Sequence, residues 1–128
     1  MLELSENLLV TEPETIAKSL ANVKFKSNVT NSQVRKYYDD FLILQKKANI
    51  NPESFKKSIL PLIKFAKAKL AYGLSRDNTG LTKDFTNELN KKIDRIETKQ
   101  CFDNFILFYQ ALIGYLKYEM KEKSNIRR

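Results

Sequence analysis

Apolar residues recur every three or four positions along most of the chain, which is the pattern of helices with one buried face. One side of the segment that ends near residue 48 is formed by Val34, Tyr37, Tyr38, Phe41, Leu44 and Ala48. Only three glycines and three prolines interrupt the 128 residues, and valines are few, so the composition does not favour strands. The pattern therefore predicts an all-α fold.

Capping and turn residues divide this pattern into about five helices. The starts of the first three are marked by Pro13, by the capping box of Thr30 with Gln33, and by Asn51-Pro52. Pro61 should bend the third helix or start it afresh, because proline removes a backbone donor. The loop sequence DNTG, residues 77–80, then precedes a fourth helix that Thr82 can cap.

A fifth helix is expected from about Cys101 to Lys121. Short connections favour a compact antiparallel bundle of these helices. We therefore predict a single helical domain over residues 1–128, with a peripheral N-terminal segment at 1–28 and a core bundle at 29–123.

The last helix is apolar on nearly every side. Phe102, Phe105 and Tyr109 lie on one face, and the opposite face carries Leu107, Phe108, Ala111, Tyr115 and Tyr118. Such a helix is either central in its own core or shared with a partner. If it is shared, Phe108, Tyr115 and Tyr118 are the candidates for an oligomer or partner interface.

The charge is concentrated on the third helix. The chain carries a net charge of +8, and between Glu53 and Asp77 there are bases but no acid: Lys56, Lys57, Lys64, Lys67, Lys69 and Arg76. A basic protein of this kind binds nucleic acid, an acidic membrane surface or an acidic protein. A membrane is the weakest of these candidates, because the apolar face is needed for the core and no apolar run reaches the roughly 20 residues of a membrane span.

Most catalytic chemistry is excluded by composition. The chain has no histidine and a single cysteine, Cys101, which we expect to be a small buried hydrophobe in a reducing cytoplasm. Asp39 and Asp40 point about 100° apart on a helix and make a poor metal site. We predict no enzymatic activity, no cofactor, no metal and no small-molecule substrate.

A helical projection separates the third helix into three faces. A core stripe contains Phe55, Ile59, Leu62, Ile63, Ala66, Leu70 and Gly73, and Lys57, Lys64 and Lys67 lie broadly opposite. A further row alternates rings with cations: Phe65, Lys69, Tyr72 and Arg76. This row could bind the phosphates and bases of a nucleic acid, or its rings could pack on a neighbouring helix while the lysines are solvated.

Three segments resemble motifs of one known family. They are VTNSQVRKYYDDF, ILPLIKFAKAKLAYGLSR and FDNFILFYQALIGYLKY, which together span roughly residues 29–120. In order and spacing they are similar to the small helical subunit of type III-A CRISPR effector complexes, the Csm complexes. Leu74, Ser75 and Gln110 depart from the family's usual residues.

The resemblance implies a non-catalytic subunit that stacks with copies of itself and contacts the target RNA as it pairs with the CRISPR RNA guide. Other Csm subunits are its implied protein partners. Carried over by motif, the RNA-binding residues are Arg35, Lys36, Lys64, Lys67, Lys69, Tyr72 and Arg76. The alternative that the residues leave open is a helical adaptor that binds an acidic protein.

Overall fold

The described residues form five α-helices. In this computed structural model, residues 1–21, 31–76 and 83–126 are described, with side chains up to residue 120. The helices are α1 (Glu12–Ala21), α2 (Asn31–Ile50), α3 (Leu60–Ser75), α4 (Lys83–Ile93) and α5 (Lys99–Ile126). Shorter helical turns are η1 (Asn7–Thr11), η3 (Pro52–Ser54) and η4 (Phe55–Ile59). No strand occurs in these ranges, so the all-α prediction is confirmed.

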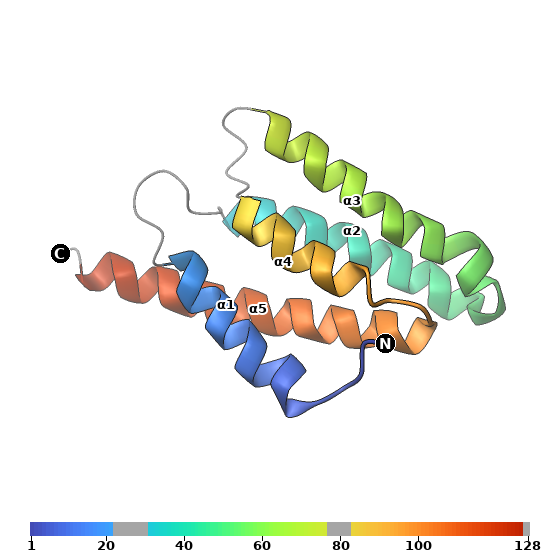
Figure 1. The fold of residues 1–128 in the computed structure, drawn as a ribbon, viewed down its shortest axis with the longest axis horizontal. Helices are drawn as coiled ribbons and strands as arrows, with labels where there is room; N and C mark the ends of the chain where they lie inside the picture. The colour runs from blue at the N-terminus through green and yellow to red at the C-terminus, as the bar shows by residue number, and fades with distance from the viewer. Residues whose placement is uncertain (22–30, 77–82, 127–128) are drawn as a thin grey trace.

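The long helix α5 is the central element of the bundle. It packs against α1 and α2, whereas α3 packs against α4 and α2 (Figure 1). Its described buried side chains are the polar Asn104 and the apolar Cys101, Phe102, Phe105, Ile106, Phe108, Tyr109, Leu112 and Leu116. Aromatic rings fill the space between α5 and α2, where Phe41 meets Phe105 edge to face at 5.0 Å between centroids.

The N-terminal segment is part of the core. Leu2, Leu8, Ile16, Ala17 and Leu20 are all buried in the same apolar cluster as α5. The side-chain amide of Asn104 donates a hydrogen bond to the carbonyl oxygen of Leu2 at 3.1 Å. The prediction of a peripheral segment is therefore wrong for residues 1–21, because their apolar side chains cover one side of α5; residues 22–28 lie outside the described ranges.

The proline signals are confirmed in the third helical region. The chain restarts at Pro52 after Asn51, and α3 begins at Leu60 with Pro61 in its first turn. Asn51 makes no side-chain capping bond; instead the Ser54 hydroxyl donates to the Asn51 carbonyl oxygen. The predicted caps at Thr30 and Thr82 and the loop at 77–80 lie outside the described residues.

The last helix begins earlier than its apolar pattern indicates. It starts at Lys99, where the hydroxyl oxygen of Thr98 accepts a hydrogen bond from the backbone N–H of Cys101 at 3.2 Å. Threonine in this position satisfies one of the free donors of the first turn. Cys101 is buried, as predicted.

Two apolar residues do not lie where the pattern placed them. Phe108, predicted at an interface, is fully buried in the apolar core, where the ammonium of Lys92 from α4 lies over its ring, 5.2 Å from the centroid. It cannot contact another chain. Leu62, predicted in the core, is 44% exposed because it faces a hollow between α2 and α3.

Within the ranges described above, no helix combines the length and the apolar character that crossing a membrane requires.

Candidate nucleic-acid interface

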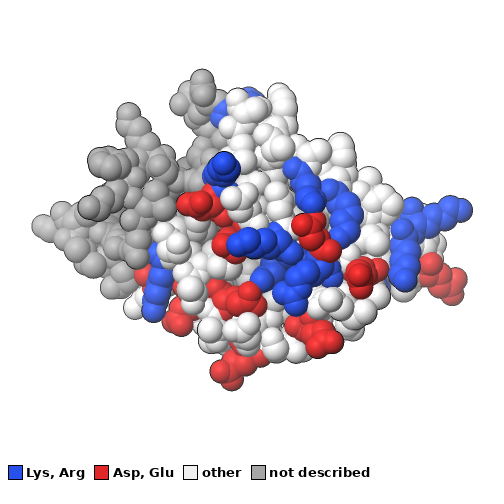
Figure 2. Space-filling model, in the orientation of Figure 1, with Lys and Arg blue, Asp and Glu red and all other residues white. Residues whose placement is uncertain are grey.

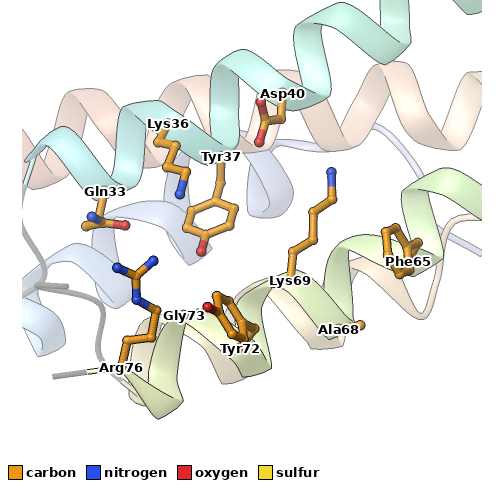
Figure 3. A pocket seen from close by; sticks show the side chains of 10 residues that line it. All are labelled: Gln33, Lys36, Tyr37, Asp40, Phe65, Ala68, Lys69, Tyr72, Gly73 and Arg76. Atoms are coloured by element: carbon orange, nitrogen blue, oxygen red, sulfur yellow. The ribbon is translucent and has the colours of Figure 1, made fainter.

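A groove of about 690 Å³ separates α2 from α3 (Figure 3). From α2 it is lined by Gln33, Lys36, Tyr37 and Asp40. From α3 it is lined chiefly by Phe65, Lys69 and Tyr72, and Arg76 lines it from the position directly after α3. Side chains of the two helices point toward one another across it.

Helical spacing brings each set of lining residues onto one face. On α2 they recur at intervals of three or four, from residue 33 to residue 40, and on α3 from residue 65 to residue 73; Arg76 is the extended residue that directly follows α3. Residues three and four apart are neighbours on a helix surface. The buried stripe of α3, with Ile63, Leu70 and Gly73, holds the helix so that its aromatic–cation row faces the groove.

Each cation described in the groove lies over an aromatic ring. Lys36 is 5.5 Å from the ring centroid of Tyr37. Lys69 lies 5.6 Å from that of Phe65, and Arg76 lies 5.7 Å from that of Tyr72. Such contacts hold a cation in place without neutralising its charge, which remains available to an anion.

The rings of α3 are open to solvent. Phe65 is 56% exposed and Tyr72 is 65% exposed, whereas Tyr37 is buried beneath them. Burial raises the pKa of Tyr37; the negative charge of Asp40 adds to this effect and the positive charge of Arg76 opposes it. The Tyr37 hydroxyl therefore stays neutral at physiological pH, and the groove has three cations against the one carboxylate of Asp40 among its lining residues.

Lys64 and Lys67 serve a different part of the molecule. The ammonium of Lys64 donates to the carbonyl oxygen of Ile93, the last residue of α4, at 2.5 Å. Lys67 forms an ion pair with Asp94, also at 2.5 Å. Cations at the C-terminal end of a helix satisfy its free carbonyls and oppose its negative dipole.

The surroundings of these two lysines weaken them as anion-binding groups. Burial lowers the pKa of Lys64 against the raising effect of Asp94. Basic and acidic side chains lie next to one another over the face that carries α4 (Figure 2). The charge of Lys67 is therefore paired within the fold, and the ammonium of Lys64 is held at a backbone carbonyl.

The structure brings together four of the seven predicted RNA-binding residues. Lys36, Lys69, Tyr72 and Arg76 line the groove. Arg35 is exposed on α2 but does not line it, because successive residues of a helix point about 100° apart. Lys64 and Lys67 bind the end of α4 instead.

On the α2 side of the groove, sequence reasoning identified only Lys36. Tyr37 was placed only on the apolar side of its helix, Gln33 only in a capping box, and Asp40 was considered only as a poor metal ligand, although all three line the groove with Lys36. Their spacing of three and four residues was a usable signal. What the sequence lacks is the information that this face of α2 lies opposite the aromatic–cation row of α3.

The groove continues into a second hollow of about 250 Å³. The two share Tyr37, Asp40, Phe65 and Lys69, and the second adds the exposed side chains of Ile43 and Leu62. This end of the α2–α3 groove therefore adds exposed aliphatic side chains, although Lys47 and Lys69 also line it.

The model of the Csm2 Type III-A family matches residues 3–122. The chain belongs to this family. The resemblance drawn from three motifs is confirmed, and the match extends to α1, which those motifs do not include. No curated protein and no solved structure matches the chain.

Membership of the Csm2 family identifies the chain as a subunit of a type III-A CRISPR complex. The Csm2 family is the structural small subunit of the Csm complex, so other Csm subunits are its partners. Within the ranges that the structure describes, no cluster of three or more cysteine, aspartate or glutamate side chains is arranged to hold a metal ion.

A second surface of this Csm2-family subunit lies between α1 and α5. A hollow of about 440 Å³ is lined by Glu14, Ala111, Gly114, Tyr115 and Tyr118. Tyr115 is half-buried and Tyr118 is 59% exposed, so two of the three predicted interface residues are accessible together. A Cβ atom added at Gly114 would meet nothing within 4 Å, which leaves room for another chain to approach.

Proposed function

We propose that this subunit binds RNA along the α2–α3 groove, independently of sequence, within the type III-A complex. The observation that carries the proposal is the groove itself, in which Lys36, Lys69 and Arg76 are each held over a ring. Phosphates suit the cations and nucleotide faces suit the exposed rings. The ligands are the target RNA and the backbone of its duplex with the guide.

The three cations supply affinity through phosphate contacts. Such contacts position an RNA without reading its bases, and base pairing with the CRISPR RNA guide then supplies the sequence specificity. Affinity should fall with salt, with a slope of about −2 in log K against log salt for three phosphates on a single strand.

The remaining predicted residues have secondary roles. Arg35, exposed beside the groove on α2, extends the positive field toward the RNA. Lys64 and Lys67 support the proposal indirectly, because they fix the end of α4 against α3.

The role we propose is non-catalytic, and the protein is cytoplasmic. The chain contains no histidine, the usual base for activating a nucleophile. Its one thiol, Cys101, is buried and accepts a hydrogen bond from the Thr98 hydroxyl at 3.3 Å. Cleavage would then belong to other subunits.

Copies of the subunit would stack through the surface between α1 and α5. Tyr115 and Tyr118 offer an exposed aromatic edge beside the open backbone of Gly114. Repetition along a stack raises the avidity for a continuous RNA without any new kind of contact. A groove that binds RNA weakly in one subunit can therefore bind a continuous RNA tightly when several subunits are stacked.

The test is a charge reversal in the groove. Lys36→Glu/Lys69→Glu/Arg76→Glu should lower the affinity for unrelated single-stranded RNAs by at least about 100-fold at low salt, since each lost phosphate contact also becomes a repulsion. Fluorescence anisotropy across a salt range measures the affinity and the slope, and circular dichroism checks the helix content.

The matched control carries the same charge change elsewhere. Lys18→Glu/Lys83→Glu/Lys117→Glu replaces three exposed lysines that do not line the groove. It should lose far less affinity than the groove variant. Equal losses in the two variants would mean that net charge alone, and not the groove, holds the RNA.

The rival function is an adaptor for an acidic protein, which the aliphatic end of the groove favours. Exposed Ile43 and Leu62 suit an amphipathic helix better than an RNA backbone. Ile43→Ser/Leu62→Ser should leave RNA affinity within about twofold if the proposal is right. The adaptor would be favoured by two results together. The wild type would bind no RNA at low salt, and the Ile43→Ser/Leu62→Ser variant would no longer co-purify with a Csm partner.

A further inference from the structure

We infer that the α2–α3 groove takes unpaired nucleotides, with bases stacked on the rings of Phe65 and Tyr72. The inference rests on the proposed function and specifies the form of RNA that the groove prefers. Phosphate contacts alone would favour a duplex, which has the higher charge density. The features that argue for single-stranded RNA are the two rings and the carboxylate of Asp40 among the described lining residues.

The two rings of α3 form a short platform. Phe65 and Tyr72 are seven residues apart, which places them on the same side of the helix at about 10 Å along its axis. Each is more than half exposed and has a cation at its ring. Inside a duplex the base faces are stacked on each other, so rings of this kind can stack only on unpaired bases.

Asp40 makes the middle of the groove unsuitable for a phosphate. It is half-buried and lines the same space as Lys36 and Lys69. A carboxylate repels phosphate but accepts hydrogen bonds from the N–H groups on the Watson–Crick edge of a base. Those edges are free only in unpaired nucleotides.

The arrangement therefore divides the groove between two parts of a nucleotide. Lys36, Lys69 and Arg76 take phosphates, and the rings of Phe65 and Tyr72 take base faces whose edges turn toward Asp40. A volume of about 690 Å³ is within the range of sites that enclose a small organic ligand, roughly 300–1,000 Å³. It leaves room for a base with its sugar.

Three RNA probes test the inference with the full chain at low salt. The first is an unstructured single strand of mixed sequence, about 12 nucleotides long, which is within the usual site size of single-strand-binding proteins. The second is the same strand annealed to its complement. The third is a strand of equal length made of abasic sites. The wild type should bind the first about 100-fold more tightly than the abasic strand, because each of the two base–aromatic stacks contributes about tenfold, and it should also bind the first more tightly than the duplex.

Ring variants then locate the contact. Tyr72→Ala and Phe65→Ala should each lose about tenfold on the single strand and nothing on the abasic strand, whereas Tyr72→Phe keeps the ring and the affinity. Ile50→Ala removes an exposed apolar side chain that lines neither the groove nor the α1–α5 hollow, and it should bind like the wild type. Both α3 rings are on the surface, so the variants fold.

The outcomes separate the inference from the proposed function. If the wild type binds the abasic strand or the duplex as tightly as the single strand, or if both alanine variants stay within twofold of it, base stacking is overturned. The phosphate groove survives that result as long as the triple charge reversal abolishes binding. If the wild type binds none of the three probes, the inference and the proposed function both fail.

Discussion

Lys92 and Glu12 form an ion pair at 2.5 Å that joins the end of α4 to the first turn of α1, eighty residues away in the chain. The Lys92 side chain is 7% exposed, and its ammonium also lies over the ring of Phe108. A buried lysine is tolerated only when its charge is paired. The packing of α1, α4 and α5 at this point therefore depends on the carboxylate of Glu12.

Removing that carboxylate should destabilise the fold. Glu12→Gln keeps the shape and the acceptor for the Asn7 side chain but leaves Lys92 buried without its partner. We expect a loss of about 3 kcal/mol in the free energy of unfolding, measured by urea denaturation. Adding Lys92→Met should recover most of it, because a thioether packs well against an aromatic ring.

Glu14→Gln is the matched control, because this acid is in the same turn of α1 and forms no described ion pair with Lys92. It should change the stability by less than about 0.5 kcal/mol. Equal stabilities of Glu12→Gln and the wild type would show that Lys92 finds water or another partner.

Tyr109 should make the fold sensitive to alkali. Its hydroxyl is buried and donates to the carbonyl oxygen of Val34 at 2.6 Å, and burial raises its pKa far above the ordinary value near 10. The contribution of the Tyr109 hydroxyl to the stability of the fold is present below about pH 10. It is lost as the pH rises above that value, because Tyr109 then ionises in the unfolded chain but not in the folded one.

The measurement compares Tyr109→Phe with the wild type. At neutral pH the variant should be less stable by about 1 kcal/mol, the typical worth of a hydrogen bond. Between pH 10 and 11, which spans the ordinary tyrosine value of about 10, the wild type should lose more stability than the variant. Parallel curves for the two proteins over this range would contradict the assignment.

Phe108 and Tyr118 should separate folding from association. Phe108→Ala should cost about 3–5 kcal/mol, as for other buried phenylalanines. Tyr118→Ala, at an exposed site, should leave stability within about 0.5 kcal/mol and weaken self-association, followed by sedimentation velocity. If Tyr118→Ala associates as the wild type does, the stacking surface does not lie at the α1–α5 hollow.

Gly114→Ala should stabilise α5. The glycine lies inside the helix, and an added Cβ meets no atom within 4 Å, so the gain is about 0.5–1 kcal/mol from the reduced entropy of the unfolded chain. The measurement is thermal unfolding. A larger side chain, as in Gly114→Gln, should keep the fold but hinder stacking if another chain approaches this backbone.

The sequence was sufficient for the helices and for one wall of the groove. Apolar periodicity and the prolines at 52 and 61 located the third helical region, and projection separated Phe65, Lys69, Tyr72 and Arg76 from the core stripe. Both are local properties of a single helix. Local periodicity carries that information without reference to the rest of the fold.

What could not be predicted depends on which helix lies opposite. Lys64 and Lys67 have the same periodicity as groove lysines, and only the position of α4 shows that they bind its end. Phe108 faces away from the main apolar stripe of α5, and it is buried in the apolar core, where Lys92 of α4 lies over its ring. To predict these contacts one needs to know how the helices pack against one another, and a helical projection does not contain that information.

The contact between Leu2 and Asn104 has a consequence for synthesis on the ribosome. Because 102 residues separate these partners, the apolar side chains near the N-terminus cannot be covered until α5 has left the exit tunnel. The nascent chain must therefore carry exposed Leu2, Leu8 and Ile16 while the residues between them and α5 are synthesised. We therefore expect the exposed apolar side chains to favour binding to a chaperone or an assembly partner before the chain folds.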